Sequence, residues 1–365
     1  MSVRTILLLA SMGTIFGQEF AAERLIEAGH WKRARSVVQT ASQDSPNTWF
    51  LSSQICHAFG DHCSAEALAQ KAVTVAPQVG KYHRQLAEVQ GVMAQRAGIF
   101  QQLGLARTFR REIDTAIRLD PKDVQARRDL LEFFLLAPGI VGGDVKKAED
   151  AAREICQFDA AEGYRAKARI AEFRKDWAQM EEMLRHATEV RPPSYRARIE
   201  LAKFYLRPEH GSESAALAMA ESAVELDPTR IDGYSILASI RTTRGEWVPL
   251  DLLLSRAANQ VPDDPTPYFR AADVLLGGRR ELEKAERYFR QYLAQEPEGN
   301  QPVAAEAHWK LGMVLRLLGE ETKAIGEWRT AVQLDPASPA QRELRKARNA
   351  GSLNTSNPVS SGGQN

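Results

Sequence analysis

Residues His308–Pro336 carry the sequence HWKLGMVLRLLGEETKAIGEWRTAVQLDP, and this stretch decides the fold. Gly319 divides it into two runs, each long enough for about three helical turns. Ala324 and Ala331 share one helical face in the second run, where small side chains let two helices approach closely. Pro336 ends that run, because proline lacks a backbone donor and clashes with the preceding turn. The stretch therefore predicts two antiparallel helices joined by a tight turn.

Prolines mark the same pattern along the rest of the chain. They recur every 31 to 44 residues, apart from one step of 71 that corresponds to two repeats. These prolines are Pro46, Pro77, Pro121, Pro192, Pro228, Pro262, Pro297 and Pro336. Alanine stands five residues before each of them except Pro297, where Tyr292 takes its place. Seventeen residues before a proline stand Gly29, Gly60, Gly245 and Gly319, and Lys175 holds that position in the fifth copy. Such a period predicts stacked units that bury a shared apolar face.

The repeated glycines, alanines and prolines resemble those of the tetratricopeptide repeat family. The resemblance covers residues 18–336, or about nine helix pairs at the period of that family. It implies an all-α fold, an α-solenoid in which antiparallel helix pairs stack into a right-handed superhelix. It also implies a concave groove, lined by the first helix of each pair, that binds a protein or peptide.

Several segments depart from the repeat. Insertions are expected near residues 100–104, 137–144 and 207–214, and insertions of this kind map to loops that can contribute to binding. Residues 337–349 are polar and helix-forming, which predicts a helix that caps the last apolar face. Residues 350–365 are rich in Ser, Gly and Asn and carry no charge, which predicts a disordered tail.

The N-terminus has the pattern of an export signal. Arg4 supplies the positive start, residues 6–16 form an uncharged and mostly apolar run, and Gly17 is a small residue at a cleavage position. We therefore interpret residues 1–17 as a signal peptide that directs the chain to the periplasm or outside the cell. The alternative is that these residues form the first helix of the first repeat in a cytoplasmic adaptor. After residue 17 the sequence predicts no membrane span.

Composition and motifs argue against several classes of function. The formal net charge is +1 with 26 % charged residues, which gives no overall electrostatic case for nucleic acid or an anionic membrane. The common catalytic and cofactor-binding motifs do not occur, and the repeats occupy nearly the whole sequence. The sequence therefore predicts a non-enzymatic scaffold without a cofactor that binds a protein or peptide.

A basic stripe is expected in the middle of the groove. Tyr164–Arg169 and Tyr195–Arg198 are copies of one phrase placed 31 residues apart, and Arg127 and Arg128 hold a similar place one repeat earlier. If first helices line the groove, the stripe consists of Arg127, Arg165, Arg169, Arg196 and Lys203. Arginine pairs well with carboxylates, so one hypothesis is an acidic or carboxylate-ended peptide partner. The alternative is that these charges pair with Glu162, Glu172 and Glu200 at helical spacing.

A second candidate cluster consists of Cys56, His57, His62 and Cys63. It lies across the predicted turn of the second repeat, and its spacing differs from the common zinc patterns. Three interpretations remain open: inward packing of Cys56 beside surface histidines, a metal or redox site formed by these four residues, and a Cys56–Cys63 disulfide formed after export.

Overall fold

A computed structural model describes residues 17–355, apart from residues 43, 97, 300 and 301. The described part of the chain is helical throughout and contains no β-strand. The predicted all-α class and the stack of antiparallel helix pairs are both confirmed. The predicted signal peptide lies, except for Gly17, outside the described residues and stays a prediction. None of the helices between residues 17 and 355 is long and apolar enough to span a bilayer.

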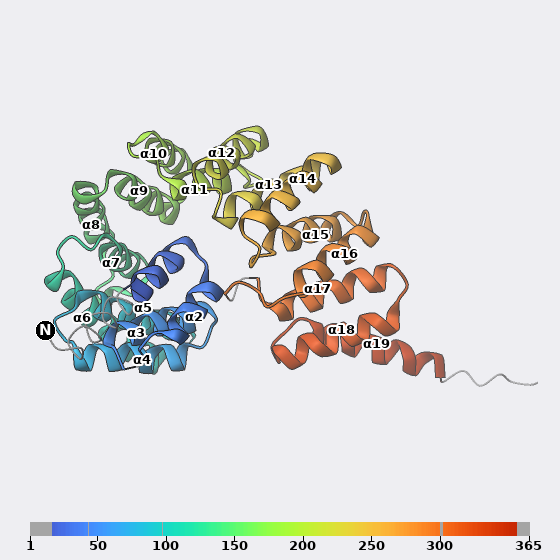
Figure 1. Ribbon diagram of the computed structural model, residues 1–365, viewed down its shortest axis with the longest axis horizontal. Helices are drawn as coiled ribbons and strands as arrows, with labels where there is room; N and C mark the ends of the chain where they lie inside the picture. Colours follow the sequence, from blue (N-terminus) through green and yellow to red (C-terminus); the bar gives the residue numbers. More distant parts are fainter. Residues whose placement is uncertain (1–16, 43, 97, 300–301, 356–365) are drawn as a thin grey trace, which may run out of the picture. The chain divides into compact units, whose positions relative to one another are not determined.

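The helices follow one another with short connections (Figure 1). In chain order they are residues 17–28, α2 (Trp31–Thr40), α3 (Pro46–Ala58), α4 (His62–Val75), α5 (Gly80–Arg96), α6 (Ile99–Leu119), α7 (Val124–Leu136), the 3-10 helix η1 (Gly139–Val141), α8 (Val145–Phe158), α9 (Ala160–Arg174), α10 (Trp177–Glu189), α11 (Tyr195–Tyr205), α12 (Glu213–Leu226), α13 (Ile231–Arg244), α14 (Trp247–Gln260), α15 (Thr266–Gly278), α16 (Leu282–Leu293), α17 (Ala304–Leu317), α18 (Glu321–Leu334) and α19 (Ala340–Thr355).

These helices form two compact units. The first ends at Gly233 and the second begins at Tyr234, so the division falls within α13. Within each unit a helix packs against its partner in the pair and against a helix of the next pair, as α5 does with α6 and α4, and α17 with α18 and α16. Contacts are therefore made mainly between neighbours in the sequence, which is the arrangement of a helical-repeat stack.

The turns inside the pairs explain the recurring glycines. Gly29, Gly60, Gly245 and Gly319 have φ angles of 88°, 83°, 71° and 82°, in the left-handed region that glycine adopts without a steric penalty. Lys175 occupies the same position in the α9–α10 pair, and its φ angle is 60°. The α9–α10 turn therefore keeps the geometry of the other turns, although a left-handed backbone is strained at a residue that has a Cβ atom.

Replacing Lys175 with glycine is expected to raise the free energy of unfolding by about 0.5–1 kcal/mol, because it relieves the left-handed backbone. The measurement is urea unfolding followed by far-UV circular dichroism. Lys167→Gly within the right-handed α9 is the matched control and should lower stability by about 1 kcal/mol. Equal effects of the two substitutions would contradict the explanation.

The recurring alanines lie where paired helices approach most closely. Ala34, Ala65, Ala216, Ala285 and Ala324, twelve residues before the prolines, are all 0 % exposed. The position five residues before each proline is also buried, and Tyr292 fills it in the α16–α17 region, donating a hydrogen bond from its hydroxyl to the Pro302 carbonyl at 2.5 Å. Close packing thus requires small residues at these positions. Tyr292 is the one large exception, and its buried hydroxyl is hydrogen-bonded.

The departures from the repeat differ in kind. Residues 100–104, expected as an insertion, lie inside α6, so the extra length extends a helix instead of forming a loop. The segments near residues 137–144 and 207–214 do connect the two helices of a pair, and the first contains η1. Helix α19 runs to Thr355, past the end predicted at residue 349. The rest of the predicted tail, residues 356–365, lies outside the described residues.

Candidate functional site

Ion pairs link the first helices of successive pairs in the first unit. We call the following five pairs the charge ladder: Arg84–Asp123 (3.2 Å), Arg128–Glu162 (2.9 Å), Arg165–Glu200 (2.8 Å), Arg169–Glu132 (2.8 Å) and Lys203–Asp232 (3.6 Å). In the first four the partners stand 34 to 39 residues apart, close to one repeat. Stacking therefore places each basic side chain beside an acidic one of the adjacent repeat.

Arg165 is the most buried base of the ladder. Its side chain is 5 % exposed and pairs with both Glu162 and Glu200. Burial alone would lower the pKa of the guanidinium, but the hydrogen bonds and charges of the two glutamates outweigh that effect and raise the pKa above its ordinary value. Arg165 is thus a compensated charge that ties α9 to α11.

Arg196 stands out because it lacks such a partner. It is the second residue of α11 and is exposed, and it makes no hydrogen bond or ion pair within the part of the chain that the structure describes. Loss of solvation lowers the pKa of its guanidinium; Glu162 opposes this, while Arg230, Arg165 and Arg128 lower the pKa further. Arg196 is therefore a cation without an ion-pair partner of its own, close to Glu162 and to three other arginines.

The remaining predicted stripe residues are divided between two places. Arg169 also lies 3.6 Å from Glu172, and Lys203 lies on the ladder beside Asp232. Arg127 instead faces α8, where it pairs with Glu154 and its guanidinium lies 5.2 Å from the centre of the Phe158 ring. The structure thus brings Arg165, Arg169, Arg196 and Lys203 onto one set of helices and places Arg127 elsewhere. Its neighbour Arg128 occupies the equivalent ladder position.

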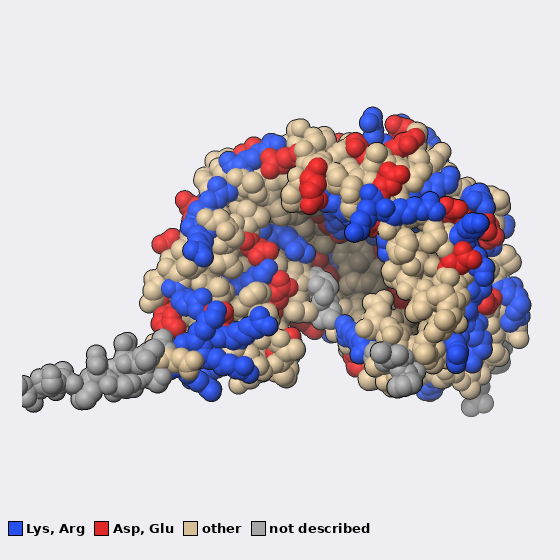
Figure 2. All heavy atoms as spheres, turned by 180° about the vertical axis from the view of Figure 1, so that it is seen from behind, with Lys and Arg blue, Asp and Glu red and all other residues tan. Residues whose placement is uncertain are grey.

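Much of the predicted basic stripe is paired with acids: Glu162 and Glu172 lie at helical spacing from their arginines, whereas Glu200 contacts Arg165 from the next repeat. Figure 2 shows the same mixture on the face it presents, where Lys and Arg side chains are interspersed with Asp and Glu. Arg230, whose guanidinium lies 4.8 Å from the centre of the Tyr195 ring, carries no sequence signal, because it precedes a helix and belongs to no repeated phrase. Arg230 adds to the positive surroundings of Arg196.

The cysteine and histidine cluster lies at the α3–α4 turn. Cys56 and Cys63 are both free thiols, and Nδ1 of His57 lies 3.3 Å from Nδ1 of His62. Asp61 caps α4 by accepting a hydrogen bond from the Ser64 backbone N–H at 3.1 Å. Among the described residues no group of three or more His, Cys, Asp or Glu side chains is arranged to hold a metal ion.

Comparison with protein families identifies the repeat in the second unit. The model of the tetratricopeptide repeat family matches residues 269–339. This segment contains the quoted stretch that ends at Pro336, so the resemblance drawn from glycine, alanine and proline positions is confirmed there. No curated protein sequence matches the chain closely enough to count as a relative.

The chain is also similar to a number of solved structures. Yeast Tom70 is 12 % identical, with 93 % of this chain and 89 % of that chain covered and a TM-score of 0.47. A thermophilic tetratricopeptide-repeat protein of Thermus thermophilus is 19 % identical, with 54 % of this chain and 98 % of that chain covered and a TM-score of 0.41. Likenesses of this degree add nothing to the assignment of a partner.

Proposed function

We propose that this chain, in which residues 269–339 are tetratricopeptide repeats, is a non-catalytic scaffold that binds an acidic peptide segment of a partner protein. The binding surface is the first-helix face, which we define as the exposed side of α7, α9 and α11 around Arg128, Arg169 and Arg196, above the buried Arg165. The proposal concerns the first unit, where the charge ladder runs from helix to helix.

The observation that carries the proposal is the charge of Arg196. Its guanidinium has donors that no described residue uses, and it lies near Arg230, Arg165 and Arg128, with Glu162 as the one nearby acid that acts against them. A carboxylate from a peptide would supply the missing acceptor in the planar, two-point geometry that arginine favours. The three nearby arginines would disfavour a basic peptide.

The charge ladder supports binding in a second way. The Arg169–Glu132 pair is partly exposed, with side chains 29 % and 39 % accessible. Pairs of this kind contribute only about 0–1 kcal/mol to stability, so Arg169 can exchange its partner for a carboxylate of the peptide at low cost. Arg165 is buried and doubly paired, and it holds α9 and α11 in register beneath the exposed cations.

The test is titration of a Glu-rich peptide against the unmodified protein, Arg196→Ala and the Arg165→Ala/Arg196→Ala double variant, by calorimetry. Loss of one charge-assisted contact is expected to weaken binding by about tenfold or more in Arg196→Ala. Binding should also weaken as salt is raised, because the contact is partly exposed. A peptide of equal length with Gln in place of Glu should bind more weakly than the acidic one.

Arg118→Ala is the matched control. Arg118 is an exposed arginine on the second helix α6 that likewise makes no hydrogen bond or ion pair within the described residues, so its removal should leave the affinity unchanged. Unchanged affinity of the acidic peptide for Arg196→Ala would refute the proposal, as would equal losses in Arg196→Ala and Arg118→Ala.

A further inference from the structure

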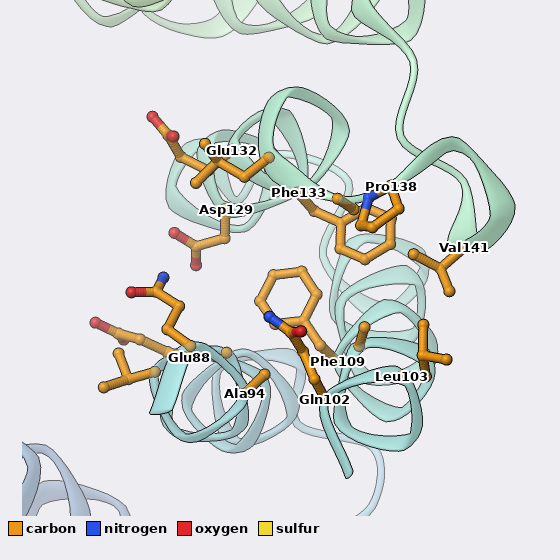
Figure 3. Close-up of a pocket in the computed structure, with 16 residues that line it drawn as sticks. Glu88, Ala94, Gln102, Leu103, Phe109, Asp129, Glu132, Phe133, Pro138 and Val141 are labelled. Atoms are coloured by element: carbon orange, nitrogen blue, oxygen red, sulfur yellow. The ribbon is translucent and has the colours of Figure 1, made fainter. Parts of the chain in front are cut away.

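A cavity of about 220 Å³ lies in the first unit between α5, α6, α7 and η1 (Figure 3). Its walls are mainly apolar and include Leu103, Phe109, Phe133, Pro138 and Val141. Three acidic residues, Glu88, Asp129 and Glu132, gather on one side of it in Figure 3. The cavity therefore has an apolar body and an acidic end.

The cavity is formed by two departures from the repeat. Helices α5 and α6 have 17 and 21 residues, longer than any other pair in the first unit, and their added turns supply Gln95, Gln102 and Leu103. The 137–144 segment supplies Pro138 and Val141. Helices of ordinary length and a short turn would leave this side of α7 open to solvent.

The loop that closes the cavity has a fixed conformation. Gly142 has a φ angle of 108°, and a Cβ atom on Gly143 would stand 1.8 Å from the Ala137 carbonyl oxygen. The Gly143 N–H donates to the Pro138 carbonyl at 3.2 Å, and the Asp144 N–H donates to the Phe134 carbonyl at 2.9 Å. The wall formed by η1 is thus held by its own backbone bonds, so the cavity exists before any ligand binds.

Aromatic rings form the base of the apolar part. The rings of Phe109 and Phe133 are stacked, with their centroids 5.5 Å apart and their planes 13° from parallel. Both rings line the cavity. Aromatic faces attract cations as well as apolar groups, so they suit a ligand that combines the two.

Asp129 is the unusual group at the acidic end. One carboxylate oxygen accepts a hydrogen bond from the Gln125 side chain at 2.9 Å, while Oδ2 is shielded from solvent and accepts none. Burial raises the pKa of Asp129 to about 7, the negative charge of Glu88 adds to this, and Arg84 acts against it.

The neighbouring cations are already engaged. Nε of Arg84 lies 3.2 Å from Asp123, whose charge also raises the pKa of Asp129, and the other end of its guanidinium is 3.9 Å from Glu88. Glu132 has its own partner in Arg169. Glu88 and Asp129 thus place two carboxyl groups at the cavity with too little positive charge to balance them.

We propose that this cavity binds a small hydrophobic amine, with its apolar body beside Phe109 and Phe133 and its ammonium group against Asp129 and Glu88. The ammonium group would supply both the positive charge and the hydrogen-bond donor that Asp129 lacks. A buried cavity of 150 Å³ holds one benzene molecule, so 220 Å³ suits a ligand of about nine or ten non-hydrogen atoms. The site is distinct from Arg196 and goes beyond the proposed peptide binding.

The test uses three probes of similar shape: 3-phenylpropylamine, the neutral butylbenzene and the anionic 3-phenylpropionate. Binding to the full chain at pH 8 is measured by ligand-observed NMR. The amine is expected to bind with a Kd on the order of 0.1–1 mM, at least tenfold more tightly than butylbenzene, and 3-phenylpropionate should not bind. Equal affinity for the amine and butylbenzene, or no binding of the amine, would overturn the proposal.

The pH dependence gives an independent measurement. A pKa of about 7 means that Asp129 is mostly ionised at pH 8 and mostly protonated at pH 6, so the affinity for the amine should fall about tenfold between these values. The amine itself stays protonated over this range. An affinity that is constant from pH 6 to pH 8 would exclude Asp129 as the group that binds the ammonium.

Substitutions then locate the site. Asp129→Asn and Glu88→Gln keep the shape of the cavity and should each weaken amine binding at least tenfold, while butylbenzene binding stays within about threefold. Val141→Trp should abolish binding of both ligands by filling the cavity from η1. Asp114→Asn is the matched control, because Asp114 lies on α6 in an exposed pair with Arg110 and away from the cavity lining. Unchanged amine binding in both Asp129→Asn and Glu88→Gln would refute the proposal.

Discussion

Replacing Trp328 with alanine is expected to lower the free energy of unfolding of the unit that contains residues 234–355 by about 3–5 kcal/mol. Trp328 lies on α18 and is 0 % exposed. Its Nε1 donates a hydrogen bond to the Trp309 carbonyl at 3.2 Å. A Cβ atom on Gly312 would stand 2.4 Å from Nε1, so the indole packs directly against the backbone of α17. Gly312 has no side chain that could fill the space left by the indole in Trp328→Ala.

The loss should extend beyond the pair that contains Trp328. Helix α18 lies between α17 and α19, and each helix of the stack depends on its neighbours. Urea unfolding monitored by far-UV circular dichroism measures the change. Leu252→Ala is the control, since Leu252 on α14 is 68 % exposed and should change stability by less than about 0.5 kcal/mol. A loss below 1 kcal/mol in Trp328→Ala would contradict the packing argument.

Replacing Gly163 with alanine is expected to cost about 3 kcal/mol, at the upper end of the range for overpacking. The added Cβ would stand 2.1 Å from Sγ of Cys156, 2.5 Å from its Cα and 2.7 Å from its backbone nitrogen. Only Asp159 separates α8 from α9, and its side chain caps α9 while its N–H bonds to the Ile155 carbonyl. The two helices therefore cannot separate without disrupting that junction.

A second substitution distinguishes backbone crowding from side-chain crowding. In the Gly163→Ala/Cys156→Ala double variant the sulfur atom is gone, but the backbone atoms of residue 156 that the new methyl group would meet remain. The double variant should therefore be no more stable than Gly163→Ala alone. Gly104→Ala, within α6 with nothing within 4 Å of the added Cβ, should raise stability by about 0.5–1 kcal/mol. Thermal unfolding of the four proteins provides the comparison. Rescue by Cys156→Ala would show that side-chain contacts alone cause the loss.

The helix pairs were predictable because each requires particular residues at fixed distances. A left-handed turn selects Gly245 or Gly319, and a buried helix crossing selects Ala324. These requirements are local and recur with every repeat. The conformation of residues 100–104 was not predictable in the same way, because added residues can either lengthen a helix or form a loop. Here they lengthen α6, which packs against α5.

The candidate site was predictable only in part. The phrase shared by Arg165 and Arg196 identified helices that carry basic side chains, but not which of these side chains face an acid on the next repeat. That depends on the rotation of each helix, which separates Arg127 from Arg128 although they are adjacent in the sequence. The cavity required more, because Glu88 and Asp129 lie 41 positions apart (129 − 88) and come to line it only after α5, α6 and α7 have folded together.

The origin of the cavity in two added segments has an evolutionary consequence. Each helix pair touches mainly its neighbours, so a deletion that shortened α6 or removed η1 would remove the cavity while leaving the remaining pairs in place. The proposed amine binding and the proposed peptide binding could therefore be gained or lost separately in descendants of one ancestor. Homologues that lack residues equivalent to 137–144 should therefore have no affinity for hydrophobic amines at this position.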